Sequence, residues 1–292
     1  MPLKHVLLAV LVAAAYGFAF VAIKAGVGEI PPLLLTGYRF FFAAVPLVFF
    51  AGRPDVGARW LIAYGMMQGV VMFGLLFMAI SLGMPAGLAS IVVQVQVFFT
   101  ILISAVLFGE RPGPAQIAGA AVALAGIGLI GWTRAESAPL MPFLLVLVSA
   151  AAWGIANVIA KAAKPQKMLP FVLWSSLAAP VPLFVLSAIF EGTAFGLPPH
   201  LPSLAGFGSI AFLAWPTTVF AFTAWVFLLR KHPAAVVTPF ALLIPVFGMG
   251  STAFAFGERL DPLAALGSLL IFLGLMINIF GPRIARLRPR PS

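Results

Sequence analysis

Long apolar segments separated by short polar links make up almost the whole chain. A helix that crosses the roughly 30 Å hydrocarbon core of a bilayer needs about 20 mainly apolar residues. Ten runs meet this requirement: 4–24, 32–51, 60–81, 86–108, 114–132, 139–161, 169–190, 203–229, 234–256 and 262–281. Strands of a membrane β-barrel would have about 10 residues of alternating polarity instead. The pattern therefore predicts an all-α polytopic membrane protein with ten transmembrane helices.

The first run also has features of a cleaved signal peptide, since it follows Lys4 and contains Ala13, Ala14 and Ala15. Its apolar core is longer than the h-region of a typical signal peptide, and nine more runs follow it. We therefore expect it to remain in the protein as the first spanning helix.

The amino-acid composition excludes most classes of enzyme. Hydrophobic residues make up 63% of the 292 residues and charged residues only 8%, whereas a soluble domain carries roughly 25% charged residues. The absence of cysteine excludes disulfides, thiolate metal sites and cysteine nucleophiles. Three histidines and seven carboxylates leave little for hydrolytic or redox chemistry. We expect no enzymatic activity, no cofactor and no metal.

The formal net charge of +10 is spread over the links, so a nucleic-acid partner is not expected. Lys and Arg accumulate in the cytoplasmic loops of membrane proteins. If the amino terminus is cytoplasmic, thirteen Lys and Arg residues lie on that side, and only Lys24, Arg134 and Arg259 lie on the other. The sequence therefore predicts two cytoplasmic termini, with the basic tail 283–292 held at an anionic leaflet of the bilayer.

Self-similarity divides the chain into two halves of five helices each. Matching segments are 15–17 and 152–154, 38–39 and 174–175, Phe-Gly-Glu-Arg at 108–111 and 256–259, and Gly119 and Gly126 with Gly267 and Gly274. Because five is odd, the halves must lie oppositely in the membrane, related by a pseudo-twofold axis in its plane. We expect one repeat over 1–135 and another over 138–282, followed by the tail. Inverted repeats are typical of secondary transporters with a midplane substrate site; the alternative is a duplicated bundle with a purely structural role.

The duplicated Phe-Gly-Glu-Arg signature, each copy followed by a polar link and a helix with spaced glycines, resembles the EamA family of the drug/metabolite transporter superfamily. The resemblance covers essentially the whole chain, and within the family it is similar to the YddG-type exporters of aromatic amino acids. It implies a ten-helix carrier that works by alternating access. Such a carrier would export amino acids, aromatic or apolar ones above all, or similar small metabolites across a bacterial inner membrane.

Polar residues inside a bilayer are costly and usually face a cavity or the bundle interior, so they are the first candidates for a substrate site. Tyr16 and Phe20 lie one turn apart on the first helix, and Trp153 and Asn157 occupy the same stripe of its repeat. Cavity lining is favoured over plain packing, because the mid-helix amide of Asn157 needs a hydrogen-bonding partner.

Arg39 lies about seven residues into its run, or roughly 10 Å deep at 1.5 Å per residue. Its guanidinium could clamp a substrate carboxylate. The alternative is a bridge to loop carbonyls or to Glu29 at the outer rim.

Further candidates come from the third, fourth, seventh and eighth runs. Trp153, Trp174 and Trp215 could form an aromatic wall, which would suit an apolar or aromatic zwitterion better than a sugar phosphate. Pro216 either frees a carbonyl for the cavity or bends its helix, and Gln96 is expected to pack between helices. The full predicted substrate-binding set is Tyr16, Phe20, Arg39, Gln68, Met72, Gln94, Trp153, Asn157, Trp174, Trp215 and Thr218.

Other polar and small residues are expected to have structural roles. Lys24 and Lys161 lie at span ends, where their ammonium groups can reach the interface. Glu110 and Glu258 could cap the next helix or pair with the following arginine. The spaced glycines of the fifth and tenth helices predict close packing, as a scaffold or a dimer seam, in a monomer or weak homodimer.

All seven carboxylates and all three histidines fall in links or at span ends. A proton-coupled carrier usually has an ionisable relay inside the membrane, so a facilitator or exchanger is predicted. A rival, an extruder of organic cations or drugs, would need a deep carboxylate. A membrane-embedded lipid-modifying enzyme would need a deep acid–base or metal constellation. A receptor or structural protein is the remaining alternative.

Overall fold

The structure, a computed structural model, describes residues 1–109, 112–137, 140–232, 237–259 and 261–287. The described residues form helices and connecting turns, with no strand among them. In the part of the chain that the structure describes, nine helical segments are long and apolar enough to cross a membrane, and a shorter apolar helix covers Phe240–Phe256. The chain is an all-helical multi-pass membrane protein. The start of the predicted run 234–256 lies outside the described residues.

The spans follow the predicted runs, and several contain a short break in helical geometry. In the first half they are α1 (Leu3–Val27), α2 (Pro32–Ala44) with η1 (Leu47–Phe49), α3 (Ala58–Gly65) with η2 (Met66–Phe73) and α4 (Gly74–Ser81), α5 (Ala86–Val92) with η3 (Val93–Val95) and α6 (Gln96–Phe108), and α7 (Pro114–Ser137). In the second half they are α8 (Met141–Ala163), α9 (Met168–Ser176) with α10 (Pro180–Phe190), α11 (Leu204–Phe212) with η4 (Leu213–Ala221) and α12 (Phe222–Lys231), η5 (Thr238–Leu242) with α14 (Leu243–Phe256), and α15 (Pro262–Leu287).

Proline and glycine set the ends of several spans. Pro32, Pro114 and Pro262 occupy the first position of α2, α7 and α15, where a missing N–H costs nothing. Gly109 and Gly257 follow α6 and α14 with φ of 66° and 64°, the left-handed conformation that ends a helix most easily at glycine.

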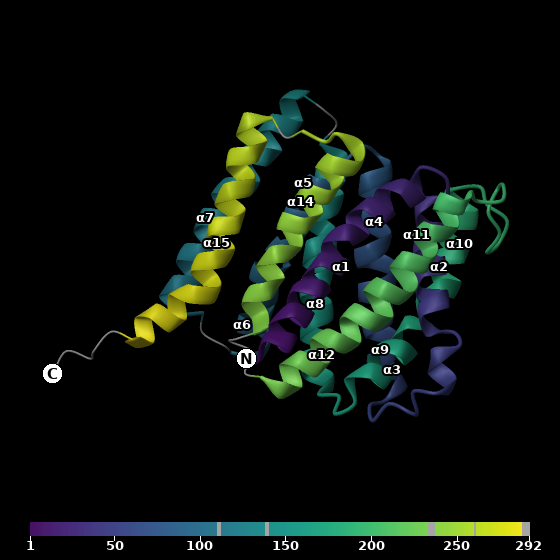
Figure 1. The fold of residues 1–292 in the computed structure, drawn as a ribbon, viewed down its shortest axis with the longest axis horizontal. Coiled ribbons are helices and arrows are strands. Elements are labelled where there is room, and N and C mark those ends of the chain that lie inside the picture. The colour runs from purple at the N-terminus through teal and green to yellow at the C-terminus, as the bar shows by residue number, and fades with distance from the viewer. Residues whose placement is uncertain (110–111, 138–139, 233–236, 260, 288–292) are drawn as a thin grey trace.

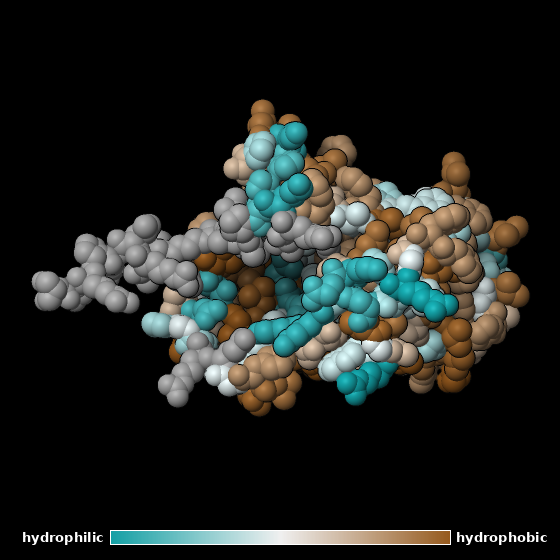
Figure 2. All heavy atoms as spheres, turned by 90° about the horizontal axis from the view of Figure 1, so that it is seen from below, coloured by the Kyte–Doolittle hydropathy of each residue, from teal (hydrophilic) through white to brown (hydrophobic). Residues whose placement is uncertain are grey.

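The helices pack as a bundle with apolar side chains on its outer surface. In Figure 1, α7 and α15 lie together on one flank, α1, α5 and α14 occupy the middle, and α2, α10 and α11 form the other flank. Leu11 and Leu124 are 54% and 65% exposed, as expected for side chains that face lipid rather than water. Seen from the end where α1 begins, hydrophilic side chains gather across the middle, while hydrophobic side chains surround them (Figure 2).

The spaced glycines of α7 and α15 face each other within the chain. A Cβ on Gly126 would lie 2.5 Å from the Gly267 carbonyl oxygen, and a Cβ on Gly119 would lie 2.6 Å from the Gly274 carbonyl oxygen. The two backbones therefore approach as closely as small residues allow. The scaffold expectation fits this geometry. The glycines that suggested a dimer seam contact each other inside one molecule, and the expectation of a monomer or weak homodimer stays a prediction.

Replacing Gly126 by isoleucine is expected to lower the melting temperature of the protein by several degrees, because overpacking a tight helix contact costs about 1–3 kcal/mol. Gly128→Ile is the matched control, since a Cβ on Gly128 would meet nothing within 4 Å. Thermal unfolding of both variants in detergent, followed by size-exclusion chromatography, measures the difference. Equal melting temperatures would show that the α7–α15 contact does not need glycine.

Candidate functional site

A cavity of about 370 Å³ lies among α1, α2, η2, α8, α9, η4 and the η3–α6 junction. Nine of the eleven residues predicted from the sequence line it: Tyr16, Phe20, Arg39, Gln68, Met72, Gln94, Trp153, Asn157 and Thr218. These residues come from both halves of the chain. The stripe of α1 and its counterpart in α8 thus meet at one cavity, as their shared spacing suggested.

Arg39 provides the charge of the cavity, and no carboxylate lies among the lining residues of the described chain. The side chain is only 4% exposed. Its Nε donates a hydrogen bond to Thr218 Oγ1 at 3.1 Å, and its guanidinium carbon lies 3.8 Å from the centroid of the Phe73 ring. Nη1 is buried without a hydrogen-bond partner in the described residues. A buried cation in this state is costly unless an anion or water meets it.

The alternative of an Arg39–Glu29 bridge is not formed. The Glu29 carboxylate instead accepts hydrogen bonds from the Ser203 backbone N–H at 2.9 Å and the Ser203 hydroxyl at 2.6 Å. These bonds hold the pKa of Glu29 below its usual value. The carboxylate therefore fastens the start of α11, and Arg39 stays available to the cavity.

Pro216 explains how Thr218 comes to support Arg39. Proline has no backbone N–H, and the helix around it opens into the π-helical turns of η4. The carbonyl oxygen of Leu213 is then taken by the hydroxyls of Thr217 and Thr218, at 2.5 and 2.8 Å. Thr218 donates to this carbonyl and accepts from Arg39, so the bent helix positions the guanidinium. The carbonyl that Pro216 leaves without its helical N–H partner is that of Phe212, four residues earlier, and the Thr217 hydroxyl lies 3.3 Å from it.

An amide cluster occupies another part of the cavity wall. Asn157 Nδ2 donates to Gln96 Oε1 at 2.8 Å and to Thr100 Oγ1 at 3.1 Å. The expected partner of Asn157 is therefore protein rather than ligand. Gln96 packs between α6 and α8 as expected, but it also lines the cavity, which the sequence did not indicate.

Trp174 and Trp215 do not line the cavity, so the expected wall of three tryptophans is not formed. The Trp174 indole donates to the Gly52 carbonyl oxygen at 2.9 Å. Trp215 is 51% exposed and donates to the Phe42 carbonyl oxygen at 3.2 Å. The aromatic lining comes instead from Tyr16, Phe20, Phe40, Tyr64, Phe73, Trp153, Phe222 and Trp225.

Ser175 is a lining residue that was absent from the predicted set. It is 1% exposed, and its hydroxyl has no hydrogen-bond partner in the described residues. The signal that could have found it is the internal repeat, because Ser175 occupies the position that matches Arg39. Tyr64, Thr217 and Trp225 also line the cavity and were not selected.

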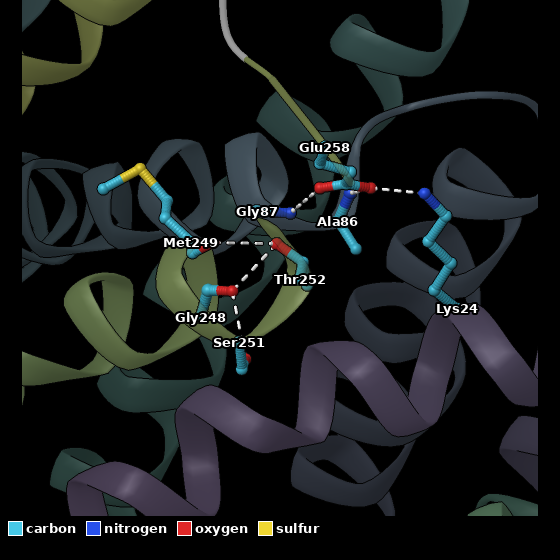
Figure 3. Close-up of polar contacts among 8 residues, drawn as sticks. All are labelled: Lys24, Ala86, Gly87, Gly248, Met249, Ser251, Thr252 and Glu258. Carbon is cyan, nitrogen blue, oxygen red and sulfur yellow. Dashed lines mark hydrogen bonds and ion pairs between the residues drawn. The ribbon is translucent and has the colours of Figure 1, made fainter. Parts of the chain in front are cut away.

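A second polar cluster joins α1, α5 and the link after α14 (Figure 3). Lys24 Nζ lies 2.5 Å from Glu258 Oε1, and the two Glu258 oxygens accept hydrogen bonds from the backbone N–H groups of Ala86 and Gly87 at 3.0 and 2.9 Å. A Cβ on Gly87 would lie 2.5 Å from Thr252 Oγ1, so the start of α5 fits closely against α14.

This cluster corrects two expectations. Lys24 is paired with Glu258 rather than extended to the interface, and Glu258 caps α5 rather than the following helix or Arg259. Burial by itself would raise the pKa of Glu258, but the bonds from Lys24, Gly87 and Ala86 outweigh it and hold the pKa below its usual value. The matching Glu110 and Arg111 fall outside the described residues, and Lys161 lies 5.1 Å from the centroid of the Phe108 ring.

A multi-pass helical membrane protein whose buried arginine faces a cavity between its helices, with aromatic side chains in the wall, has the features of a solute carrier. The EamA-like transporter family matches residues 3–132 and again residues 140–280. The chain belongs to this transporter family.

Named relatives cover nearly the whole chain. A "Probable amino-acid metabolite efflux pump" of Escherichia coli (strain K12) is 38% identical over 287 residues, which is 96% of both proteins. A protein of the same name from Salmonella typhimurium is 36% identical over 97% of both proteins. A solved crystal structure with 22% identity aligns with a TM-score of 0.65 over 98% of this chain and 99% of the other, which shows a shared fold.

Proposed function

We propose that this protein exports amino acids or similar small metabolites across a bacterial inner membrane, with Arg39 binding the substrate carboxylate. The observation that carries the proposal is the buried guanidinium whose Nη1 has no partner among the described residues. A carboxylate is the group that such a donor fits best. The names of the two efflux pumps similar to this chain agree with an amino-acid metabolite as cargo.

The aromatic lining supports a preference for aromatic or apolar amino acids. Tyr16, Phe20 and Trp153 offer ring faces and edges to a substrate side chain. A cavity of about 370 Å³ lies in the range of small-molecule sites, roughly 300–1,000 Å³.

Reciprocal contacts support ten spans in two inverted repeats, 1–135 and 138–282. A Cβ on Gly17 in α1 would meet Phe247 and Gly248 of α14, and a Cβ on the matching Gly154 in α8 would meet Phe99 and Thr100 of α6. Likewise Lys24 lies over the Phe256 ring, and Lys161 over the Phe108 ring. The π-helical segments η2 and η4 also occupy matching places. Such exchange of partners is what a pseudo-twofold axis between two halves produces, and rocking about it would give alternating access.

Basic residues support cytoplasmic termini. The start of α1 and the described end of α15 lie at the same end of the bundle (Figure 1). With that end in the cytoplasm, the excess of Lys and Arg in the short links obeys the positive-inside rule. The cavity would then receive substrate from the cytoplasm and release it on the opposite side.

The lining residues of the described chain include no Asp, Glu or His, which supports a facilitator or exchanger. The same observation disfavours the organic-cation extruder, because Arg39 would repel a cation and no lining carboxylate would attract it.

Uptake of radiolabelled phenylalanine, methionine and threonine into liposomes containing the purified protein tests the proposal. We expect saturable uptake, strongest for phenylalanine, which is accelerated by unlabelled amino acid trapped inside. Empty liposomes are the control. Transport that follows an imposed pH gradient without exchange would contradict the exchanger, and uptake of tetraphenylphosphonium without any amino acid would favour the rival function.

A further inference from the structure

We infer that the cavity recognises the free α-ammonium group of its substrate through two uncharged oxygen atoms, Gln68 Oε1 and Ser175 Oγ. The substrate class is therefore a zwitterion, held by Arg39 at its carboxylate and by these oxygens at its ammonium. Amines without a carboxylate and N-acylated amino acids are excluded. The inference rests on the proposed function and adds the groups that decide selectivity.

Unsatisfied polar atoms gather at the cavity. Four buried side-chain polar atoms lack a partner among the described residues, and three of them belong to lining residues: Arg39 Nη1, Gln68 Oε1 and Ser175 Oγ. Leaving a buried polar group unpaired costs about 1–3 kcal/mol. Such a cost at one donor and two acceptors around one cavity is recovered by a ligand that carries an acceptor and several donors close together. An α-amino acid has this arrangement.

The three groups lie around one segment of the fold, η2. Arg39 stacks on Phe73 of η2 at 3.8 Å, and Gln68 belongs to η2 itself. The backbone of α9 lies against the same span, because a Cβ on Gly65 would collide with the Ser175 carbonyl oxygen and a Cβ on Gly69 would lie 2.5 Å from Ala179 Cβ. The close approach that these glycines permit brings Ser175 to the same side of the cavity as Gln68.

Several other polar atoms of the wall are bonded within the protein. Asn157, Gln96 and Thr100 bond to one another. Gln94 Nε2 lies 3.4 Å from the Ala241 carbonyl oxygen, to which it donates. The amide nitrogen of Gln68 contacts Met72 Sδ at 3.8 Å, which leaves the amide oxygen as its free atom. Among the lining acceptors, Gln68 Oε1 and Ser175 Oγ are the ones buried without a partner in the described residues, so an arriving ammonium group recovers most by meeting these two.

The acceptors carry no charge, and this decides selectivity. Two neutral oxygens satisfy ammonium donors but do not repay the full desolvation of a lone cation beside Arg39. An amine without a carboxylate is therefore held weakly. Acylation of the nitrogen removes both its charge and most of its donors, which leaves Gln68 Oε1 and Ser175 Oγ unpaired again.

The test is competition against radiolabelled phenylalanine in counterflow with the liposomes described above. N-acetylphenylalanine and phenethylamine are expected to inhibit at least tenfold more weakly than unlabelled phenylalanine. Ser175→Ala and Gln68→Met are expected to weaken the apparent affinity for phenylalanine about fivefold or more. They should leave inhibition by N-acetylphenylalanine unchanged, because that compound does not use the ammonium acceptors.

Ser176→Ala is the matched control, since the Ser176 hydroxyl is bonded to the Val172 carbonyl oxygen at 2.8 Å. Elution of each variant as a single size-exclusion peak in detergent shows that it folds. Equal inhibition by phenylalanine and its N-acetyl derivative, or equal losses in Ser175→Ala and Ser176→Ala, would overturn the inference while leaving the exporter in place. Absence of uptake of every amino acid would overturn the inference and the proposed function together.

Discussion

Replacing Arg39 with methionine is expected to lower amino-acid uptake about 30-fold or more without destabilising the protein. Loss of a charge-assisted contact to a buried carboxylate costs about 2–5 kcal/mol, and each 1.4 kcal/mol is a factor of ten. The folded protein, by contrast, is relieved of a buried cation with an unpaired Nη1. We therefore expect the melting temperature of Arg39→Met to equal or exceed that of the wild type, the mark of a residue kept for function rather than stability.

Arg39→Lys separates charge from geometry. Lysine keeps the positive charge but lacks the guanidinium fork, so it cannot bond Thr218 as Nε does and present a second donor to the cavity. We expect an intermediate loss of uptake. Arg59→Lys is the control, because Arg59 is exposed in the first turn of α3 and stacks near Trp60. Wild-type uptake by Arg39→Met would refute the carboxylate clamp, and a large fall in its melting temperature would make Arg39 a structural residue.

The double variant Lys24→Glu/Glu258→Lys, which exchanges the charges of the two residues, is expected to be less stable than the wild type. Glu258→Gln weakens both the ion pair and the cap on α5, and we expect a loss of about 1–3 kcal/mol, or several degrees in melting temperature. In Lys24→Glu/Glu258→Lys the ion pair can form again. The new lysine, however, has no acceptor for the N–H groups of Ala86 and Gly87, and its charge opposes the helix dipole.

Lys24→Met is the companion variant, because it removes the pair and leaves the cap. We expect it to be more stable than the charge exchange, as measured by thermal unfolding in detergent. Recovery of wild-type stability in the exchanged variant would mean that the ion pair alone matters.

Acidity provides an independent check on Glu258. Its pKa is lowered from the ordinary value of 4.5 in the folded protein, so the carboxylate stabilises the fold above that pH. The contribution is lost as the pH falls through the lowered value. The difference in melting temperature between the wild type and Glu258→Gln should therefore shrink below about pH 4.5. A difference that stays constant with pH would contradict a stabilising role of the ionised Glu258 carboxylate.

Cavity residues were predicted correctly where residues close together in the sequence determine the direction of the side chain. Tyr16 and Phe20, and likewise Trp153 and Asn157, share a stripe on a regular helix, so their common direction follows from helical spacing. Trp215 fails because its half-exposed indole donates to the Phe42 carbonyl oxygen, a partner 173 residues away that the local pattern does not reveal. Ser175 was not selected because a serine in an apolar helix has no distinctive pattern of its own.

Most of the apolar helices and the division into two matching halves could be predicted from the sequence, because hydropathy, proline and glycine positions and repetition are properties of short segments. Which polar atoms lack a partner depends on tertiary packing. Glu258 meets the start of α5, 171 residues away in sequence, and Arg39 meets Thr218, 179 residues away. Such partners depend on how whole helices are rotated and bent against one another. The same packing pairs the amide nitrogen of Asn157 and leaves Arg39 Nη1 and Ser175 Oγ without a partner among the described residues.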